Sequence, residues 1–370
     1  MQDAPLELTP QEILTDYRGV NACAPMVRYG KLPFRSVVSQ YNCPLVWTPM
    51  MLATEFSRSQ TARDSDFSTN STERGTFLLE ERHSNPAAIV DEFDHAPEPR
   101  GTHSRGKRER RVKGRLIIQF AANDPVHLAD AAELASPFVD AIDLNCGCPQ
   151  KWAYQEGIGC ALLRKPELVA DLVRTTKQRL GWNYAVCVKI RVDSDQSRTE
   201  QLVSNILASG ADVLTVHGRT RLQPSSSHPV NLPAIAFARS CAKGQIPVIA
   251  NGDVFDVADA ARIRQETGAE GIMSARGLLA NPALFAGHHQ TPLEAIYSFI
   301  YFSTSQSLLF SLFHRHLAYM LESRFTSRKE RIHFNSLASY AGVIDWCHDK
   351  FGGEPGWHAS VSPTSRSSVP

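Results

Sequence analysis

Two cysteines, Cys146 and Cys148, close an apolar segment that begins at Phe138, and a single glycine separates them. Pro149 follows at once, and proline rarely continues the interior of a strand. The sequence therefore predicts a strand whose tip carries two thiols. A thiol in such a position can transfer a proton, bind a metal ion or pack as a small apolar side chain.

These three interpretations of the thiols differ in what else they require. Packing is the usual state of a free cysteine. Zinc would need further ligands, for which Cys160 and His217 are conceivable, but the C-x-C spacing lacks the paired C-x-x-C pattern, so we expect no metal. Proton transfer is the only interpretation that also explains the polar residues at the ends of the neighbouring strands.

A lysine, Lys189, interrupts the apolar segment 186–192. A buried ammonium group is costly unless it meets a negative group. The ring of a reduced flavin can carry negative charge at its pyrimidine edge, and Gln119 could hydrogen-bond the same edge. These two residues favour a flavin cofactor over a lysine that merely extends towards solvent.

Two glycines, Gly252 and Gly277, follow the last two predicted strands, and Arg276 precedes the second of them. Glycine lets the backbone approach an anion closely, and the first turn of the following helix points its amides towards that anion. The alternative is that both glycines only form tight turns. Together the two positions favour a phosphate-bearing cofactor where α/β barrels commonly bind phosphate.

All these residues lie at the ends of short apolar segments that alternate with helical patterns. Such segments imply a parallel sheet, and eight of them imply closure into a (β/α)8 TIM barrel of the α/β class. An open Rossmann sheet is disfavoured because no G-x-G-x-x-G follows the first segment. The predicted strands are 20–24, 45–48, 116–121, 139–144, 185–192, 213–216, 247–250 and 271–274, and the main predicted helices are 32–41, 125–135, 166–180, 200–209, 232–241 and 257–267.

Further regions precede, interrupt and follow the barrel, which we place at residues 20–287. A polar lead-in with a short helix that starts near Pro10 occupies residues 1–19. Residues 57–114 form a polar insertion with a basic end, expected to be partly disordered, to contain a short helix at 78–82 or 87–93, and to overhang the substrate mouth. A smaller C-terminal helical domain (288–353) and a Ser/Pro-rich disordered tail (354–370) follow.

The composition indicates the cellular compartment of the protein but says little about its activity. The chain has 39 Lys and Arg against 38 Asp and Glu residues, so only local clustering of charge could indicate nucleic-acid binding. Several polar residues break the apolar stretch 296–312, so we expect no membrane span. Eight dispersed cysteines without a secretory leader indicate a reducing compartment, the cytoplasm or the nucleus.

Six motifs occur in the order and spacing of the FMN-dependent tRNA-dihydrouridine synthases, and the sequence resembles this family from residue 21 to residue 353. The segments 150–153, 278–282 and 313–322 resemble the eukaryotic subfamily that acts at positions 20a and 20b of the D-loop. The motifs are Ala24-Pro25-Met26, Asp143 to Gln150, Lys189-Ile190-Arg191, His217-Gly218-Arg219-Thr220, Asn251-Gly252-Asp253 and Ala275-Arg276-Gly277.

The resemblance implies FMN as cofactor, NADPH or NADH as reductant, and tRNA as partner, and we expect a monomer. It implies that Cys148 protonates C5 of an extruded uridine whose C6 receives hydride from the flavin. Asn145, Arg191 and Arg219 would bind the substrate. The cofactor-binding residues that it implies are Pro25, Met26, Val27, Gln119, Lys189, His217, Asn251, Gly252, Asp253, Ala275 and Arg276.

Two other functions stay open at this point. One is a flavin-dependent barrel oxidoreductase that acts on a small pyrimidine-like molecule, and the other is a tRNA-binding homologue without turnover. Clustered basic residues in the C-terminal region favour an RNA partner over a small molecule. They are Arg315, Arg324, Arg328, Lys329 and Arg331.

Overall fold

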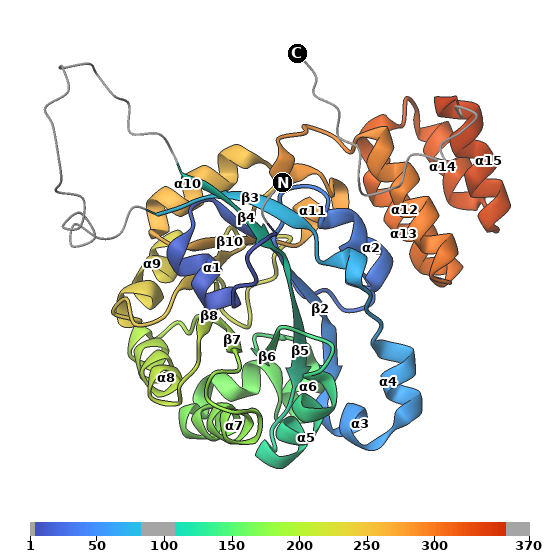
Figure 1. The fold of residues 1–370 in the computed structure, drawn as a ribbon. Helices are drawn as coiled ribbons and strands as arrows, with labels where there is room; N and C mark the ends of the chain where they lie inside the picture. The colour runs from blue at the N-terminus through green and yellow to red at the C-terminus, as the bar shows by residue number, and fades with distance from the viewer. Residues whose placement is uncertain (1–3, 83–107, 353–370) are drawn as a thin grey trace, which may run out of the picture.

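Eight parallel strands close into a barrel at the centre of the computed structural model, which describes residues 4–82 and 108–352 (Figure 1). The strands follow one another round the barrel in the order β1-β10-β9-β8-β7-β6-β5-β2, which confirms the predicted (β/α)8 barrel. The barrel strands are β1 (Val20–Cys23), β2 (Leu45–Leu52), β5 (Arg115–Ala121), β6 (Ala141–Cys146), β7 (Val186–Arg191), β8 (Val213–His217), β9 (Val248–Asn251) and β10 (Gly271–Ser274).

Strand β2 is longer than predicted. We expected Pro49 to end it, but β2 continues to Leu52 and its register with β5 shifts between Trp47 and Met50. Proline is tolerated in a strand at such an irregularity, because the missing N–H falls where the ladder is already interrupted. The expectation that Pro49 closes this strand is therefore wrong.

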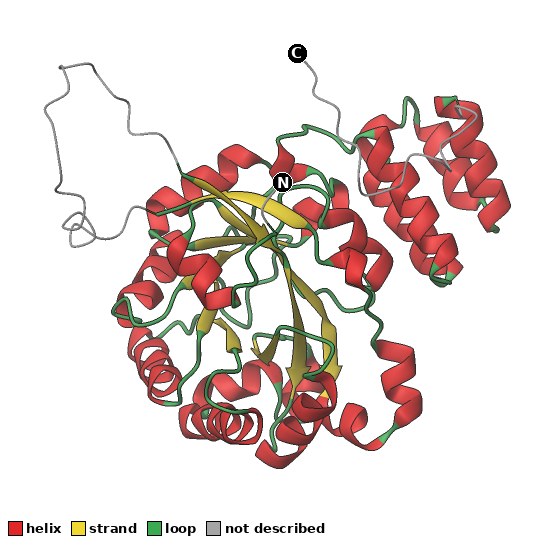
Figure 2. Ribbon diagram, in the orientation of Figure 1, coloured by secondary structure: helices red, strands yellow, loops and turns green. Residues whose placement is uncertain are grey.

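The helices that cover the barrel begin where short polar side chains cap free backbone amides. Asp124 accepts a hydrogen bond from the His127 amide before α5, and Asn231 accepts one from the Ala234 amide before α9. Figure 2 shows these helices surrounding the strands. They are α2 (Leu32–Val38), α3 (Ala53–Arg58), α4 (Gln60–Asp66), α5 (Pro125–Ala135), α6 (Lys151–Gln155), α7 (Pro166–Leu180), α8 (Gln196–Ala208), α9 (Leu232–Cys241), α10 (Val257–Thr267) and α11 (Arg276–Ala280).

A helix and a hairpin close the amino-terminal opening of the barrel. The helix is α1 (Pro10–Asp16), and the hairpin consists of β3 (Thr76–Glu80) paired antiparallel with β4 (Glu109–Lys113). Phe77 of β3 and Val112 of β4 are buried in the same apolar cluster as Leu14 of α1 and Leu45 of β2. Only Gly114 separates β4 from β5, so the hairpin lies where the strands start (Figure 1).

Two expectations for the insertion are wrong. Residues 78–80, expected in a helix, belong to β3, where Phe77 and Leu79 are buried while Leu78 is exposed, which is the period of a strand. The described part of the insertion's basic end, expected to overhang the substrate mouth, lies in or next to β4 at the opposite opening, and residues 100–107 lie outside the described residues. The helix expected at 87–93 and the tail at 354–370 lie outside the described residues.

Four helices follow the barrel; the first two pack against it, and the other two pack against α13. Helix α12 contacts α2, and α13 contacts α11, so the helices meet elements that follow the carboxyl ends of β1 and β10. None of the described helices is long and apolar enough to span a membrane. The four helices are α12 (Leu293–Ser305), α13 (Phe310–Met320), α14 (Arg328–Ser336) and α15 (Tyr340–Phe351).

One histidine lies at the centre of this contact. His316 of α13 is fully buried, stacks on Phe34 of α2 and packs against Phe299 of α12, and its Nε2–H donates to the carbonyl of Tyr29 at 3.1 Å. Its other ring nitrogen, Nδ1, is buried without a partner among the described residues. Burial lowers the pKa of His316 to about 3, so the contact holds a neutral ring.

We expect acid to weaken the protein through His316. Because the folded-state pKa lies below the unfolded value of about 6.5, the stability that the neutral ring contributes is present above about pH 6.5 and is lost as the pH falls towards 3. Denaturant unfolding at about pH 7 and about pH 4 should show a smaller acid loss for His316→Gln than for the wild type. Equal acid losses in the two proteins would contradict this role.

Candidate active site

Polar side chains gather inside the barrel near the carboxyl ends of its strands. Gln119 of β5 is in register with Asp143 of β6, and Asn145 of β6 is in register with Lys189 of β7. His217 of β8 is likewise in register with Asn251 of β9. Since every strand is parallel, these residues meet at one end of the barrel, where barrel enzymes carry their active sites.

The two thiols of the C-x-C motif have different surroundings. Cys146 is fully buried in the main apolar core, and burial raises its pKa well above the usual value. Cys148 is only partly buried and packs beside Met50, Ala153 and Ile158. Accessibility therefore singles out Cys148 as the thiol able to meet a substrate.

The loop that carries Cys148 is anchored on both its amides and its carbonyls. The Asn145 Oδ1 atom accepts hydrogen bonds from the amides of Gly147, at 3.0 Å, and Cys148, at 2.8 Å. The carbonyl of Gly147 accepts from Arg191 Nε at 3.0 Å, and the carbonyl of Cys148 accepts from the amide of Cys160, also at 3.0 Å. These four bonds hold the thiol in one place, as a proton donor requires.

Gly159 makes close approach to this loop possible. Its φ is +60°, and a Cβ atom at this position would lie 2.8 Å from the carbonyl oxygen and 2.9 Å from the Cβ atom of Cys148. We expect Gly159→Ala to destabilise the protein by about 1–3 kcal/mol and to displace the thiol. Denaturant unfolding checks the first effect, and the alkylation rate of Cys148 checks the second.

Gly19→Ala is the matched control for that prediction. Gly19 has a similar φ of +69°, but a Cβ there would meet nothing within 4 Å. This variant should show only the backbone strain and leave Cys148 alkylation unchanged. If the two alanine variants were equally stable and equally reactive, the close approach to Cys148 would not matter.

Two oppositely charged residue types, Asp143 of β6 and Lys189 of β7, are buried in the strands beside the thiol loop. Burial raises the pKa of Asp143, and burial together with the Arg191 charge lowers the pKa of Lys189 to about 8. Lys189 is 8 % exposed and its charge favours the ionised form of Asp143. The sequence prediction missed Asp143 as a partner for Lys189, although both residues interrupt apolar strands in the same way.

His217 lies close to a cluster of charges. Burial, with the charges of Lys189, Arg191 and Arg219, lowers the pKa of His217 to about 2, so the ring is neutral. The Arg219 guanidinium donates to His217 Nε2 at 3.1 Å. A neutral ring whose Nε2 accepts must carry its proton on Nδ1, which is the nitrogen left for a further acceptor.

The two arginines predicted to bind substrate make several contacts within the protein. Arg191 donates to the carbonyls of Gly147, Thr220 and Gln223. Arg219 is 1 % exposed, donates to the carbonyl of His228 and forms an ion pair with Asp253. Arg191 thus ties the thiol loop to the segment after β8, and substrate contact by either arginine stays a prediction.

The predicted phosphate site has less free space around its glycines than we expected. Gly252 has φ +133°, and a Cβ there would lie 2.7 Å from Val230. A Cβ on Gly277 would collide with the carbonyl of Val254. Both glycines are required by internal packing, while Arg276, which is partly exposed and paired with Asp253, remains available at the edge.

The remaining residues predicted to bind a cofactor lie at the same end of the barrel. Pro25, Met26 and Val27 follow β1, and Ala275 follows β10, the neighbouring strand. Met26 is buried while Val27 is half exposed. The barrel therefore brings all the predicted cofactor residues to one opening, and their contact with a cofactor stays a prediction.

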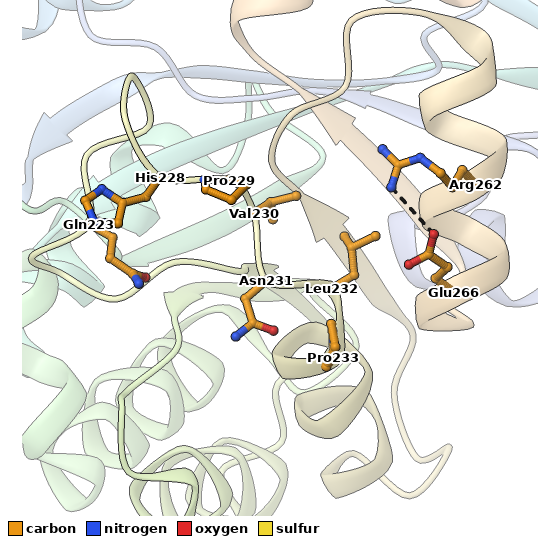
Figure 3. A pocket seen from close by; sticks show the side chains of 9 residues that line it. All are labelled: Gln223, His228, Pro229, Val230, Asn231, Leu232, Pro233, Arg262 and Glu266. Carbon is orange, nitrogen blue, oxygen red and sulfur yellow. Dashed lines mark ion pairs between the residues drawn. The ribbon is translucent and has the colours of Figure 1, made fainter.

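The described residues offer no metal site, and one surface hollow lies apart from the candidate site. Among the described residues, no three His, Cys, Asp or Glu side chains are grouped so that they could hold a metal ion. Figure 3 shows a hollow between the segment 223–233 and α10, where Arg262 and Glu266 form an ion pair of 3.6 Å. None of the predicted site residues lines that hollow.

A closed α/β barrel that gathers a thiol, a buried lysine and a neutral histidine at the carboxyl ends of its strands has the arrangement of a barrel enzyme. The chain belongs to the dihydrouridine synthase (Dus) family, whose pattern matches residues 22–345. The match covers the barrel and most of the four helices that follow it, so the predicted family is confirmed.

Curated relatives match over nearly the whole chain. A tRNA-dihydrouridine(20a/20b) synthase of Schizosaccharomyces pombe is 44% identical, with 96% of each chain covered. The synthase-like protein of Homo sapiens is 39% identical and covers 93% of this chain and 94% of its own. That of Saccharomyces cerevisiae is 35% identical and covers 94% of this chain and 84% of its own. All three names include NAD(P)+.

Proposed function

We propose that this protein is a tRNA-dihydrouridine synthase that reduces the C5–C6 double bond of D-loop uridines at positions 20a and 20b. The observation that carries the proposal is the near full-length similarity to synthases with those printed positions, combined with an anchored, partly exposed thiol at the barrel opening. We propose NADPH or NADH as the reductant, because the names of the relatives include NAD(P)+.

The residues at the opening fit FMN. Lys189, whose pKa is lowered by burial and by the Arg191 charge, suits the electron-rich edge of a flavin ring. The buried Thr215 Oγ1 lacks a hydrogen-bond partner among the described residues. His217 Nδ1–H and Asn251 offer polar groups beside it, and Arg276 would bind the phosphate. When bound, FMN would supply hydride to C6 of the uracil.

The chain's own residues would supply the rest of the reaction. Cys148 would hold a proton at Sγ and give it to C5 from the face opposite the cofactor. The reacting atoms must come within about 3–3.5 Å, which the four bonds to the thiol loop help to secure. The uridine must leave its stack to reach the opening, since a stacked base does not expose both faces, one to Cys148 and one to the cofactor.

The C-terminal helices support an RNA partner, although not through every residue that the sequence suggested. Arg324 donates twice to the carbonyl of Thr291, and Arg331 is paired with Glu322 at 2.5 Å. Arg328 and Lys329 are exposed at the start of α14. We propose that Arg328 and Lys329 contact phosphates of the tRNA.

Reversing the charge of Arg328 and Lys329 should weaken tRNA binding and change its salt dependence. Removing one contact between a basic side chain and a phosphate should reduce the slope of log affinity against log salt by about 1. Lys113→Glu is the control, because Lys113 lies on β4 at the opposite opening. Affinity measured at several salt concentrations would contradict the assignment if the α14 variants and the Lys113 variant had the same slope.

Flavin content and NADPH consumption test the proposed function against its two alternatives. Purified protein reconstituted with FMN should show bound flavin and should consume NADPH faster when unmodified tRNA is present. Consumption stimulated by free uridine or uracil instead would favour a small-molecule oxidoreductase. Tight tRNA binding without bound flavin would favour a tRNA-binding homologue. Cytoplasmic or nuclear location and the monomeric state stay predictions.

A further inference from the structure

The buried carboxylate of Asp143 has no part in the proposed proton transfer, yet it begins a chain of hydrogen bonds that ends on the backbone of the thiol loop. We propose that Asp143 is a positioning residue that fixes the amide orientations of Gln119 and Asn145 and thereby anchors the amides of Gly147 and Cys148. The proposal depends on the proposed function only in treating Cys148 as the proton donor.

The hydrogen-bond chain starts at Asp143 Oδ2, which acts only as an acceptor. Asp143 Oδ2 accepts from the indole Nε1–H of Trp47 at 3.0 Å and from Gln119 Nε2 at 2.7 Å. Because an indole nitrogen can donate but not accept, Trp47 keeps Oδ2 in the accepting role. Asp143 therefore selects the amide orientation in which the NH2 group of Gln119 faces it.

The amide orientation of Gln119 in turn determines the amide orientation of Asn145. With its nitrogen towards Asp143, Gln119 presents Oε1 to Asn145, whose Nδ2 donates to it at 2.7 Å. Asn145 must then present Oδ1 to the loop, where it accepts from the two backbone amides. Flipping either side-chain amide would place donor against donor at hydrogen-bond distance.

The hydrogen-bond chain from Trp47 through Asp143 and Gln119 to Asn145 is buried along its length. Trp47 and Asp143 are fully buried, Gln119 is 1 % exposed and Asn145 is 7 % exposed. A buried polar group that loses its partner cannot replace it with bulk water, so each orientation is strongly preferred. The other anchors of the loop, Arg191 and the amide of Cys160, bind its carbonyls and cannot substitute for Asn145 at the two N–H groups.

The same chain determines what it offers to a bound ring. Both lone pairs of Asn145 Oδ1 are used by the two loop amides, whereas its NH2 group keeps a second N–H that is not needed within the hydrogen-bond chain. Asn145 can therefore only donate at the opening. This suits the carbonyl oxygens of a uracil or flavin ring and disfavours an exocyclic amino group in the same place.

Two substitutions of Asp143 separate its accepting role from its charge. Asp143→Asn keeps an oxygen able to accept from Trp47 and Gln119, and should leave the chain intact. Asp143→Leu keeps the branched shape but has no acceptor, so nothing then fixes the amide orientation of Gln119. Asn145→Ala removes the last member of the chain and defines the effect of leaving both loop amides without their acceptor.

Hydrogen exchange of the Gly147 and Cys148 amides in the FMN-reconstituted protein measures the anchoring directly. Losing their acceptor should speed exchange about tenfold in Asp143→Leu and in Asn145→Ala, while Asp143→Asn should stay near the wild type. The alkylation rate of Cys148 should likewise change in Asp143→Leu and in Asn145→Ala and stay near the wild-type value in Asp143→Asn. The double variant Asp143→Leu/Asn145→Ala should be no worse than Asn145→Ala alone.

Unchanged exchange in Asp143→Leu, beside faster exchange in Asn145→Ala, would overturn the proposal. Equal acceleration by Asp143→Asn and Asp143→Leu would also overturn it, because charge and not acceptance would then be responsible. If Asp143→Leu does not fold, Gln119→Leu breaks the same chain at its middle and must accelerate exchange likewise. Neither readout uses tRNA, so failure of the proposed function would show separately as absent uridine reduction.

Discussion

Replacing Cys148 with alanine is expected to lower the rate of uridine reduction by about 10²–10⁴-fold, the usual contribution of a positioned proton donor. The thiol is the partly exposed one of the pair, and four hydrogen bonds hold its backbone. Single-turnover conversion of unmodified tRNA measures the loss. Bound flavin and its reduction by NADPH should stay near the wild-type level, because in the proposed function Cys148 acts on the uracil and not on the flavin.

Cys146→Ala is the matched control for that result. Cys146 has the same chemistry two residues away, but it is fully buried in the apolar core. Its loss should cost stability, about 1 kcal/mol, and leave conversion within a small factor. Similar losses of conversion from both alanine variants would remove the assignment of Cys148 as the proton donor.

Lys189→Met is expected to lower the rate of uridine reduction by about 10²–10³-fold, the loss typical when one buried electrostatic group is removed from a reacting site. Lys189 is a buried basic residue inside the barrel, and in the proposed function it would stabilise negative charge that develops on a bound flavin. Methionine keeps the length of the side chain and removes the charge. Stopped-flow measurement of conversion, with flavin saturating, tests the expectation.

The pH dependence separates the charge of Lys189 from its shape. Burial and Arg191 lower its pKa to about 8, so the ammonium is present below that pH and is lost above it. The wild-type rate of flavin reduction by NADPH, a step that does not use the Cys148 proton, should fall as the pH rises through about 8, and Lys189→Met should lack this alkaline limb. Lys189→Arg should keep the charge and move the limb upwards, since guanidinium titrates above about pH 12. The same limb in Lys189→Met would contradict the account.

The periodic parts of the fold could be predicted from the sequence, and the irregular parts could not. Doubly apolar strands separated by capped helices imply the barrel, and the predicted helices at 125–135 and 232–241 have the observed bounds. Pro49 misled the prediction, because a register shift lets β2 continue. The hairpin β3–β4 was missed because its paired residues are 29 or more positions apart in the sequence.

In the candidate site, too, some residues could be predicted from the sequence, whereas their contacts could not. Cys148 could be proposed because its C-x-C motif ends a strand and resembles that of the family, and Lys189 because it is a charged residue inside an apolar strand. Asp143 carries the same signal, yet its role depends on a chain through Gln119 and Asn145 that no spacing reveals. The partners of Arg191 and Arg219 were equally hidden, since they are backbone carbonyls of loops that only the closed barrel brings together.

Reduction of unmodified tRNA in deuterated water tests the central claim most directly, because solvent exchanges with the Cys148 thiol. With NADPH as reductant, nucleoside mass spectrometry should find dihydrouridine at positions 20a and 20b, carrying solvent deuterium at C5. Cys148→Ala should yield almost none, and Cys146→Ala should match the wild type. Full conversion by Cys148→Ala, or solvent deuterium at C6 in place of C5, would contradict the account.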